Sequence, residues 1–371
     1  LSAMEFLCNI RLHQTMKLPP NPDKGRSKPL QISYSDYGYH DQDPWNPDDE
    51  AVVLLCGALM GTRFCYSHLD QLAKENKVRI IHPDRPGIGG SDPVKLEERI
   101  SVWLEMVPLL LKHLNIKHVS LASHSGGLVY ALNTLLTHPH LLHPTHPYVA
   151  FFAPWVHHSH SGVSTMLATS FLPTPLIGKF ASLARFVNNN VSPLVGLSGN
   201  LIDTLTPTSN PATPPLPAPV QIPALAPLPQ DQASFSACIR PLIMQYLFAE
   251  AIDGISADAQ LFLKKGSGAA WSPPPPLFTD LDSFVPLLAA RRAASPFISL
   301  LHIDAFHGEK DDMVGAKGAR WFDQCWEQMP ASGKVEYRSQ TMQGTEHNYL
   351  LDARFGVSEL WLGRVRGAFG V

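Results

Sequence analysis

Ser125 has the surroundings that a nucleophilic serine needs. The segment VSLASHSGGLVY (residues 119–130) begins as a short buried strand and continues, after Gly126 and Gly127, as an apolar helix. This pattern predicts a tight strand-to-helix turn that strains the serine backbone and exposes its hydroxyl. Helix N-terminal N–H groups would face the negative oxygen of an acyl-transfer intermediate, and we expect Gly126 to donate one of them. A serine that caps an ordinary helix is the alternative.

The segments around this turn predict an α/β fold. Short apolar or alternating runs alternate with stretches of helical spacing, and 371 residues are enough for one main domain with a large insertion. Strands are predicted at 31–38 (as an edge strand), 51–55, 78–81, 119–122, 148–153, 297–303 and 335–342. Helices are predicted at 66–77, 95–115, 128–132 onward, 241–265 and 315–328.

Two motifs resemble those of the α/β-hydrolase family. SHSGG (123–127) is similar to the family's G-x-S-x-G elbow, with serine in place of the first glycine, and DRPGIGGS (84–91) is similar to its D-x-R-G-x-G-x-S loop. The resemblance covers residues 30–156 and 296–371. It implies a mostly parallel central sheet flanked by helices, with an inserted, largely helical cap or lid. For the 84–91 loop we expect a structural role, in which its Asp and Arg tie the loop down.

The resemblance also implies a catalytic triad. GEKDDMV (308–314) is similar to the family's G-x-x-D-x-x-V turn, which assigns the acid to Asp311, with Asp312 and Glu309 as alternatives. His347 lies in GTEH (344–347) after the last predicted strand, where the family has its histidine. Ser125 would be the nucleophile, His347 its base, and Asp311 the group that orients the imidazole. This chemistry needs no cofactor.

A second oxyanion donor is expected in the turn after strand 51–55. That turn reads Cys56-Gly57-Ala58-Leu59, and the family uses the N–H of the residue after His-Gly. Cysteine replaces the histidine here, and by position Ala58 would be the donor, with Leu59 as a close rival. We expect Leu59 to contact substrate as well, together with Trp155, which follows the strand at 148–153.

Residues 157–295 are predicted to form the cap, between core segments 1–156 and 296–371. From 156 to 202 the only Lys, Arg, Asp or Glu residues are Lys179 and Arg185, and so uncharged a segment is expected to lie over Ser125 as a lid. Residues 205–229 contain nine prolines, which predicts an extended, exposed strap. An apolar linker or a homodimer surface is the alternative.

The composition excludes several classes of partner. The net charge is −3 without a basic cluster, so neither nucleic acid nor an anionic membrane is expected, and no apolar run is long enough to cross a bilayer. The five cysteines form no C-x-x-C pair, and the histidines near 138–146 and 157–160 lack carboxylate or cysteine support. We therefore predict no metal site and a cytoplasmic location. Residues 4–8 are too short for a signal peptide and are predicted to be an arm.

The resemblance narrows the reaction. A serine at the elbow argues against epoxide hydrolases and haloalkane dehalogenases, which use aspartate there, and GGLV (126–129) lacks the Gly-Gly-Ser-Trp of proline iminopeptidases. We predict hydrolysis of an ester, lactone or thioester of a hydrophobic small molecule. Alternatives are carbon–carbon bond hydrolysis, acyl transfer or cyclisation by the same triad, or a receptor-like ligand-binding protein with slow turnover.

Overall fold

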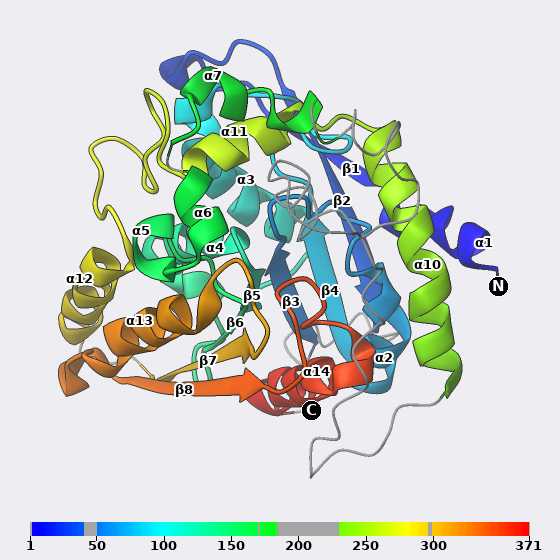
Figure 1. Ribbon diagram of the computed structural model, residues 1–371. Helices are drawn as coiled ribbons and strands as arrows, with labels where there is room; N and C mark the ends of the chain where they lie inside the picture. Colours follow the sequence, from blue (N-terminus) through cyan, green and yellow to red (C-terminus); the bar gives the residue numbers. More distant parts are fainter. Residues whose placement is uncertain are drawn as a thin grey trace.

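The computed structural model describes residues 2–40, 50–169, 171–182, 184, 230–295 and 299–370. Within these ranges one eight-stranded sheet runs through the centre, with helices on both faces (Figure 1). Its order is β1-β2-β4-β3-β5-β6-β7-β8; β2 is antiparallel to both of its neighbours, and all later pairs are parallel. The strands are β1 (Gln14–Leu18), β2 (Leu30–Gly38), β3 (Ala51–Cys56), β4 (Val78–Pro83), β5 (Ser120–His124), β6 (Tyr148–Phe152), β7 (Leu301–Gly308) and β8 (Val335–Met342). The predicted α/β class with a mostly parallel sheet is confirmed.

Alternate residues of the strands face two separate apolar layers. In β3, Leu54 belongs to the layer that includes side chains of α3, α4, α12 and α13, whereas Val53 and Leu55 belong to the layer with α2 and α14. Both layers are buried, which explains why β3 is apolar throughout. The helices are α1 (Ala3–Leu7), α2 (Asp70–Glu75), α3 (Arg99–His113), α4 (Gly127–Thr137), α5 (His158–Ser161), α6 (Ser164–Thr169), α7 (Thr174–Ile177), α10 (Gln230–Ala249), α11 (Asp253–Phe262), α12 (Leu281–Ala293), α13 (Gly315–Glu327) and α14 (Val357–Ala368).

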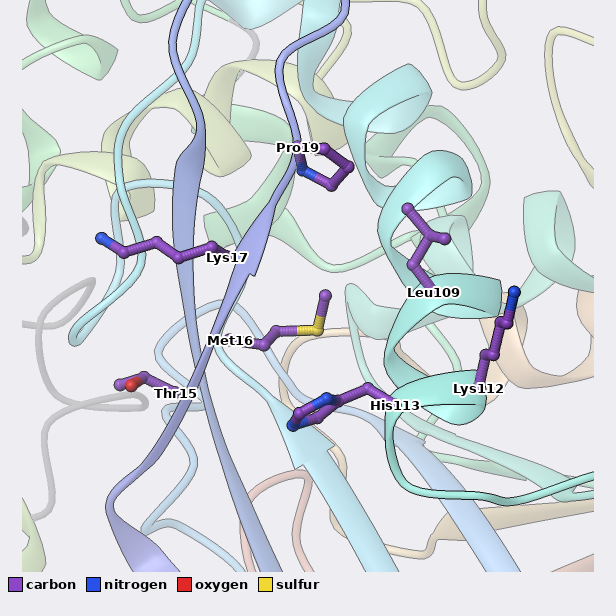
Figure 2. A pocket seen from close by; sticks show the side chains of 7 residues that line it. All are labelled: Thr15, Met16, Lys17, Pro19, Leu109, Lys112 and His113. Atoms are coloured by element: carbon purple, nitrogen blue, oxygen red, sulfur yellow. The ribbon is translucent and has the colours of Figure 1, made fainter.

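The strand predicted as an edge strand, β2, lies inside the sheet. β1 pairs along it and takes the edge position. Figure 2 shows Met16 of β1 pointing toward α3, while Thr15 and Lys17 point the other way, as alternate residues of a strand do. A hollow of about 580 Å³ lies between β1 and α3, and none of the predicted site residues lines it.

Strand β7 extends further than its sequence indicated. The sequence predicts this strand at 297–303, of which 297 and 298 lie outside the described residues, and a turn from Gly308 onward; the strand begins at Leu301. In the structure β7 continues through Gly308, because β8 pairs with it along its whole length. The predicted strand at 335–342 is confirmed as β8.

The described part of the inserted segment after β6 is largely helical, as predicted. Figure 1 shows α6, α7 and α11 together at one end of the sheet, while α10 runs beside α1. The single helix predicted at 241–265 is two helices, and α10 begins at Gln230 and continues through Pro241. A proline inside a helix removes a backbone hydrogen bond, and burial of Ile239 and Ile243 on either side offsets that cost.

Part of the predicted cap lies outside the residues that the structure describes. Residues 185–229, which contain the end of the uncharged segment and the whole predicted strap at 205–229, are not among the described residues. The division into two core segments and a cap therefore stays a prediction. Among the described residues, no helix combines the length and the apolar character that crossing a bilayer requires.

Candidate active site

The three predicted triad residues follow strands that point the same way. Ser125 follows β5, Asp311 follows β7 and His347 follows β8, and parallel strands place such residues at one edge of the sheet. His347 Nε2 lies 2.7 Å from Ser125 Oγ, and His347 Nδ1 lies 2.7 Å from Asp311 Oδ2. The structure thus brings all three together in the order serine, histidine, carboxylate.

Ser125 has the strained backbone that its sequence predicts. Its φ is +51°, in the left-handed region that residues with a side chain rarely adopt. Its N–H donates to the carbonyl of Phe152 at 2.9 Å, and its own carbonyl accepts from Leu128 N at 3.0 Å, so strand and helix both hold the turn. The hydroxyl was expected to be exposed, but Ser125 is only 5% exposed.

The glycines after Ser125 allow two close contacts. A Cβ on Gly127 would lie 2.1 Å from the carbonyl oxygen of Cys56, at the end of β3. A Cβ on Gly126 would lie 2.1 Å from a ring carbon of Phe262, on the cap helix α11. Only glycine therefore fits between the elbow and its two neighbours, and the aromatic ring of Phe262 covers the elbow.

Gly127→Ala is expected to destabilise the protein by about 1–3 kcal/mol, because the added methyl group would clash with backbone atoms of Cys56 and Gly57, which cannot move aside as a flexible side chain could. Gly363→Ala is the matched control, since a Cβ there meets only the Asn76 side chain, at 4.0 Å, on an exposed part of α14. That change is expected to be neutral or to stabilise by up to about 1 kcal/mol. Urea unfolding of both variants measures the difference; equal free energies of unfolding would contradict the close packing of β3 and α4.

Asp311 is the acid that reaches the histidine. Its Oδ1 accepts from the backbone N–H groups of Met313 and Val314 at 2.9 and 2.7 Å, which leaves Oδ2 for His347. The Asp311 side chain is buried, whereas Asp312 is exposed. The assignment that rested on spacing from Gly308 therefore agrees with the geometry.

Hydrogen bonds join the loop that carries Asp311 to the loop that carries the histidine. Glu309 N donates to Met342 O at 3.1 Å, and Lys310 N donates to Thr345 O at 2.9 Å. The carboxylate of Glu309, one of the alternative acids, accepts from Gly344 N at 2.8 Å. Glu309 thus holds the two loops together.

The contact between His347 and Asp311 shifts the pKa values of both groups in favour of their charged forms. Burial disfavours the charged imidazole, but the charge and hydrogen bond of Asp311 outweigh this and raise the pKa of His347 above its ordinary value. Burial alone would raise the pKa of Asp311, yet His347 and two backbone N–H groups lower it. The carboxylate stays ionised and receives Nδ1–H, so Nε2 of the neutral ring is left to accept the Ser125 proton.

A second histidine connects the elbow to the turn after β3. Burial, together with the neighbouring His347, lowers the pKa of His124 to about 4, so its ring is neutral. Its Nε2 lies 2.8 Å from the carbonyl of His347 and must carry the proton, because a carbonyl only accepts. Its Nδ1 then accepts from Tyr66 Oη at 2.8 Å, and Tyr66 Oη accepts from Ala58 N at 3.0 Å.

These hydrogen bonds contradict the prediction that Ala58 supplies the second oxyanion donor. The N–H of Ala58 is bound to Tyr66 rather than available to a substrate oxygen. Leu59, its rival in the sequence, is the remaining candidate in the same turn. Nothing in the sequence pointed to Tyr66, because its role depends on a contact between residues far apart in the chain.

The two residues expected to contact substrate lie where the elbow meets the cap. Trp155 N–H donates to Ser125 O at 3.3 Å, and Trp155 Nε1 donates to Phe262 O at 3.2 Å. Leu59 is half-buried and packs against both the main core and the small apolar cluster of the cap. Sequence reasoning missed Phe262, whose ring lies directly on Gly126.

Comparison with known proteins identifies the fold. No family model and no curated protein matches the sequence. Solved structures do match. A carboxylesterase of Nitrososphaera gargenis aligns with a TM-score of 0.53 and 14% identity over 96% of this chain and 99% of its own. A bromoperoxidase of Bacillus anthracis aligns with a TM-score of 0.54 and 15% identity over 95% of this chain and 99% of its own. The chain has the α/β-hydrolase fold. The enol-lactonase of Burkholderia xenovorans LB400 is also similar in fold, with a TM-score of 0.51 and 11% identity over 96% of this chain and 100% of its own.

Proposed function

We propose that the chain is a serine hydrolase that cleaves an ester, lactone or thioester bond of a hydrophobic small molecule through an acyl-enzyme. One observation carries the proposal: His347 lies 2.7 Å from both Ser125 and Asp311, at a strained strand-to-helix turn. Several solved structures with the same fold are esterases, which supports the reaction class.

The geometry supports the following sequence of steps. As Ser125 Oγ attacks the carbonyl carbon, His347 Nε2 takes its proton, and Asp311 stabilises the imidazolium. The oxyanion would accept hydrogen bonds from the backbone N–H groups of Gly126 and Leu59. In comparable sites each such donor stabilises the transition state by about 3 kcal/mol. His347 then protonates the leaving group, and a water molecule, activated by the same imidazole, releases the acyl group from Ser125.

A hydrophobic substrate suits the surroundings of the elbow. Phe262, Trp155 and Leu59, which lie around the elbow and the turn after β3, are all apolar. Apolar surface that a substrate buries against such side chains contributes about 25 cal/mol per Å². Side chains and backbone N–H groups supply all the steps, so the proposal includes no cofactor. It includes a cytoplasmic location, because all five cysteines are free thiols.

A panel of p-nitrophenyl esters with acyl groups from acetate to decanoate, extended by acyl thioesters and macrolactones, tests this function. The wild-type chain is expected to complete many turnovers, with kcat/KM rising as the acyl part becomes more apolar. A single equivalent of product per chain would instead indicate a ligand-binding protein that retains a slow triad. Preference for short, charged esters would contradict the hydrophobic substrate while leaving the triad in place.

A further inference from the structure

A buried cluster of charges connects the cap helix α11 to the core. Asp258 of α11 has no exposed surface, and it accepts from Arg85 Nε at 2.6 Å and from Arg99 Nε at 2.8 Å. Tyr130 Oη of the elbow helix α4 also donates to Asp258, at 2.5 Å. Both arginines are 1% exposed, so two guanidinium groups with almost no access to water share one carboxylate from the cap as their counter-ion.

Arg85 connects this cluster to the turn after β3. Its Nη1 donates to the carbonyl of Gly57 at 2.6 Å, and its Nη2 donates to the carbonyls of Ala58 and Leu59 at 2.7 and 2.9 Å. A peptide unit is planar, and its C=O and the following N–H point in opposite directions. Holding the Ala58 carbonyl therefore aims the N–H of Leu59 away from Arg85. The same contact at Gly57 orients the N–H of Ala58 toward Tyr66.

We infer that Asp258 is a positioning residue for the oxyanion hole. It acts through Arg85, so that the 57–59 turn keeps its donor geometry only while the cap helix α11 is seated on the core. The inference rests on the proposed function, because it assigns Asp258 to the hydrolytic site. It adds that the cap helps to assemble the catalytic machinery as well as covering it.

The energetics of buried ions explain why the carboxylate matters. A buried guanidinium is stable only when opposite charge and hydrogen-bond acceptors replace its water. Without the charge of Asp258, Arg85 and Arg99 repel each other with no counter-ion between them. This repulsion would move the Arg85 guanidinium away from the three carbonyls of the turn. Only arginine can bond Asp258 and the turn at once, because its donors form a planar fork.

The experiment compares Asp258→Asn and Arg85→Lys with the wild-type chain. Both variants are expected to lower kcat by about 10²-fold, the loss seen when one oxyanion donor is removed, while KM changes little. A trifluoromethyl ketone, whose tetrahedral adduct places a negative oxygen in the hole, is expected to bind more weakly by a similar factor. The pH midpoint of kcat should stay that of the wild type, since neither change touches His347 or Asp311.

Glu250→Gln is the matched control. Glu250 forms another ion pair between the inserted segment and the core, with Arg63 at 2.6 Å, but Arg63 does not bond the 57–59 carbonyls. Its kcat is expected to stay within about 2-fold of wild type, in line with the small effects of partly exposed pairs. Titration of reactive serine with a fluorophosphonate corrects every rate for the fraction of folded chains.

The outcomes separate the two proposals. A wild-type chain that neither turns over esters nor reacts at Ser125 refutes the proposed function itself. An active wild type with an unchanged kcat per reactive serine in Arg85→Lys overturns the positioning role, and this variant keeps the test valid if Asp258→Asn does not fold. Loss of kcat together with a shifted pH midpoint also overturns it, because the damage would then lie in the triad.

Discussion

Ser125→Ala is expected to lower kcat on the best ester of the panel by about 10⁶-fold, and His347→Ala by nearly as much. The double variant should lose no more than either single one, because the hydroxyl is a weak nucleophile without the imidazole, and the imidazole has no proton to take without the hydroxyl. The 2.7 Å contact between Ser125 Oγ and His347 Nε2 is the basis of this shared role. Losses that multiply in the double variant would contradict it.

A fluorophosphonate gives the same prediction a second measurement. It should add once per chain, and peptide mass spectrometry should locate the adduct at Ser125. Ser125→Ala should abolish labelling. Ser123 is the internal comparison, because it lies two residues earlier on β5 and is fully buried. Labelling that survives in Ser125→Ala would transfer the nucleophile to another serine.

Asp311→Asn is expected to lower kcat by about 10⁴-fold, because an amide cannot hold the imidazole in the tautomer that leaves Nε2 free for Ser125. Asp312→Asn is the matched control and should be mild, since Asp312 is exposed and only Asp311 contacts Nδ1. Steady-state kinetics of both variants on one ester measures the contrast. A larger loss in Asp312→Asn would contradict the assignment of the acid.

The same pair of variants should differ in pH dependence. Hydrolysis requires neutral His347, so the rate falls as the pH drops through the pKa of this residue. Asp311 raises that pKa, which places the wild-type midpoint above the ordinary histidine value of about 6.5. Removing the charge in Asp311→Asn should move the midpoint to lower pH. An unmoved midpoint would show that another group limits the rate.

Local patterns predicted most of the fold and which three residues meet at the elbow. β3 and β6 are short apolar runs because both faces of each strand are covered, and the residues of the two strands show this requirement directly. The meeting of Ser125, Asp311 and His347 was predictable because their order along the chain follows the ends of strands in one parallel sheet. The left-handed Ser125 followed from the small residues around it.

What the sequence did not reveal depends on contacts between distant residues. β1 went unnoticed because Thr15 and Lys17 point outward on an edge strand, which leaves too few buried positions to form a pattern. The occupied N–H of Ala58 requires Tyr66 to fold back onto the turn. The role of Arg85 requires Asp258, which is 173 residues away in the chain.

The backbone of Ser125 shows that reactivity and stability compete at this position. A left-handed conformation costs a residue with a side chain about 1–2 kcal/mol, and glycine would adopt it without that penalty. Glycine, however, would remove the hydroxyl on which the triad acts. Selection for stability alone would therefore drive position 125 away from serine, and its persistence would be a sign that the chain is maintained for its chemistry.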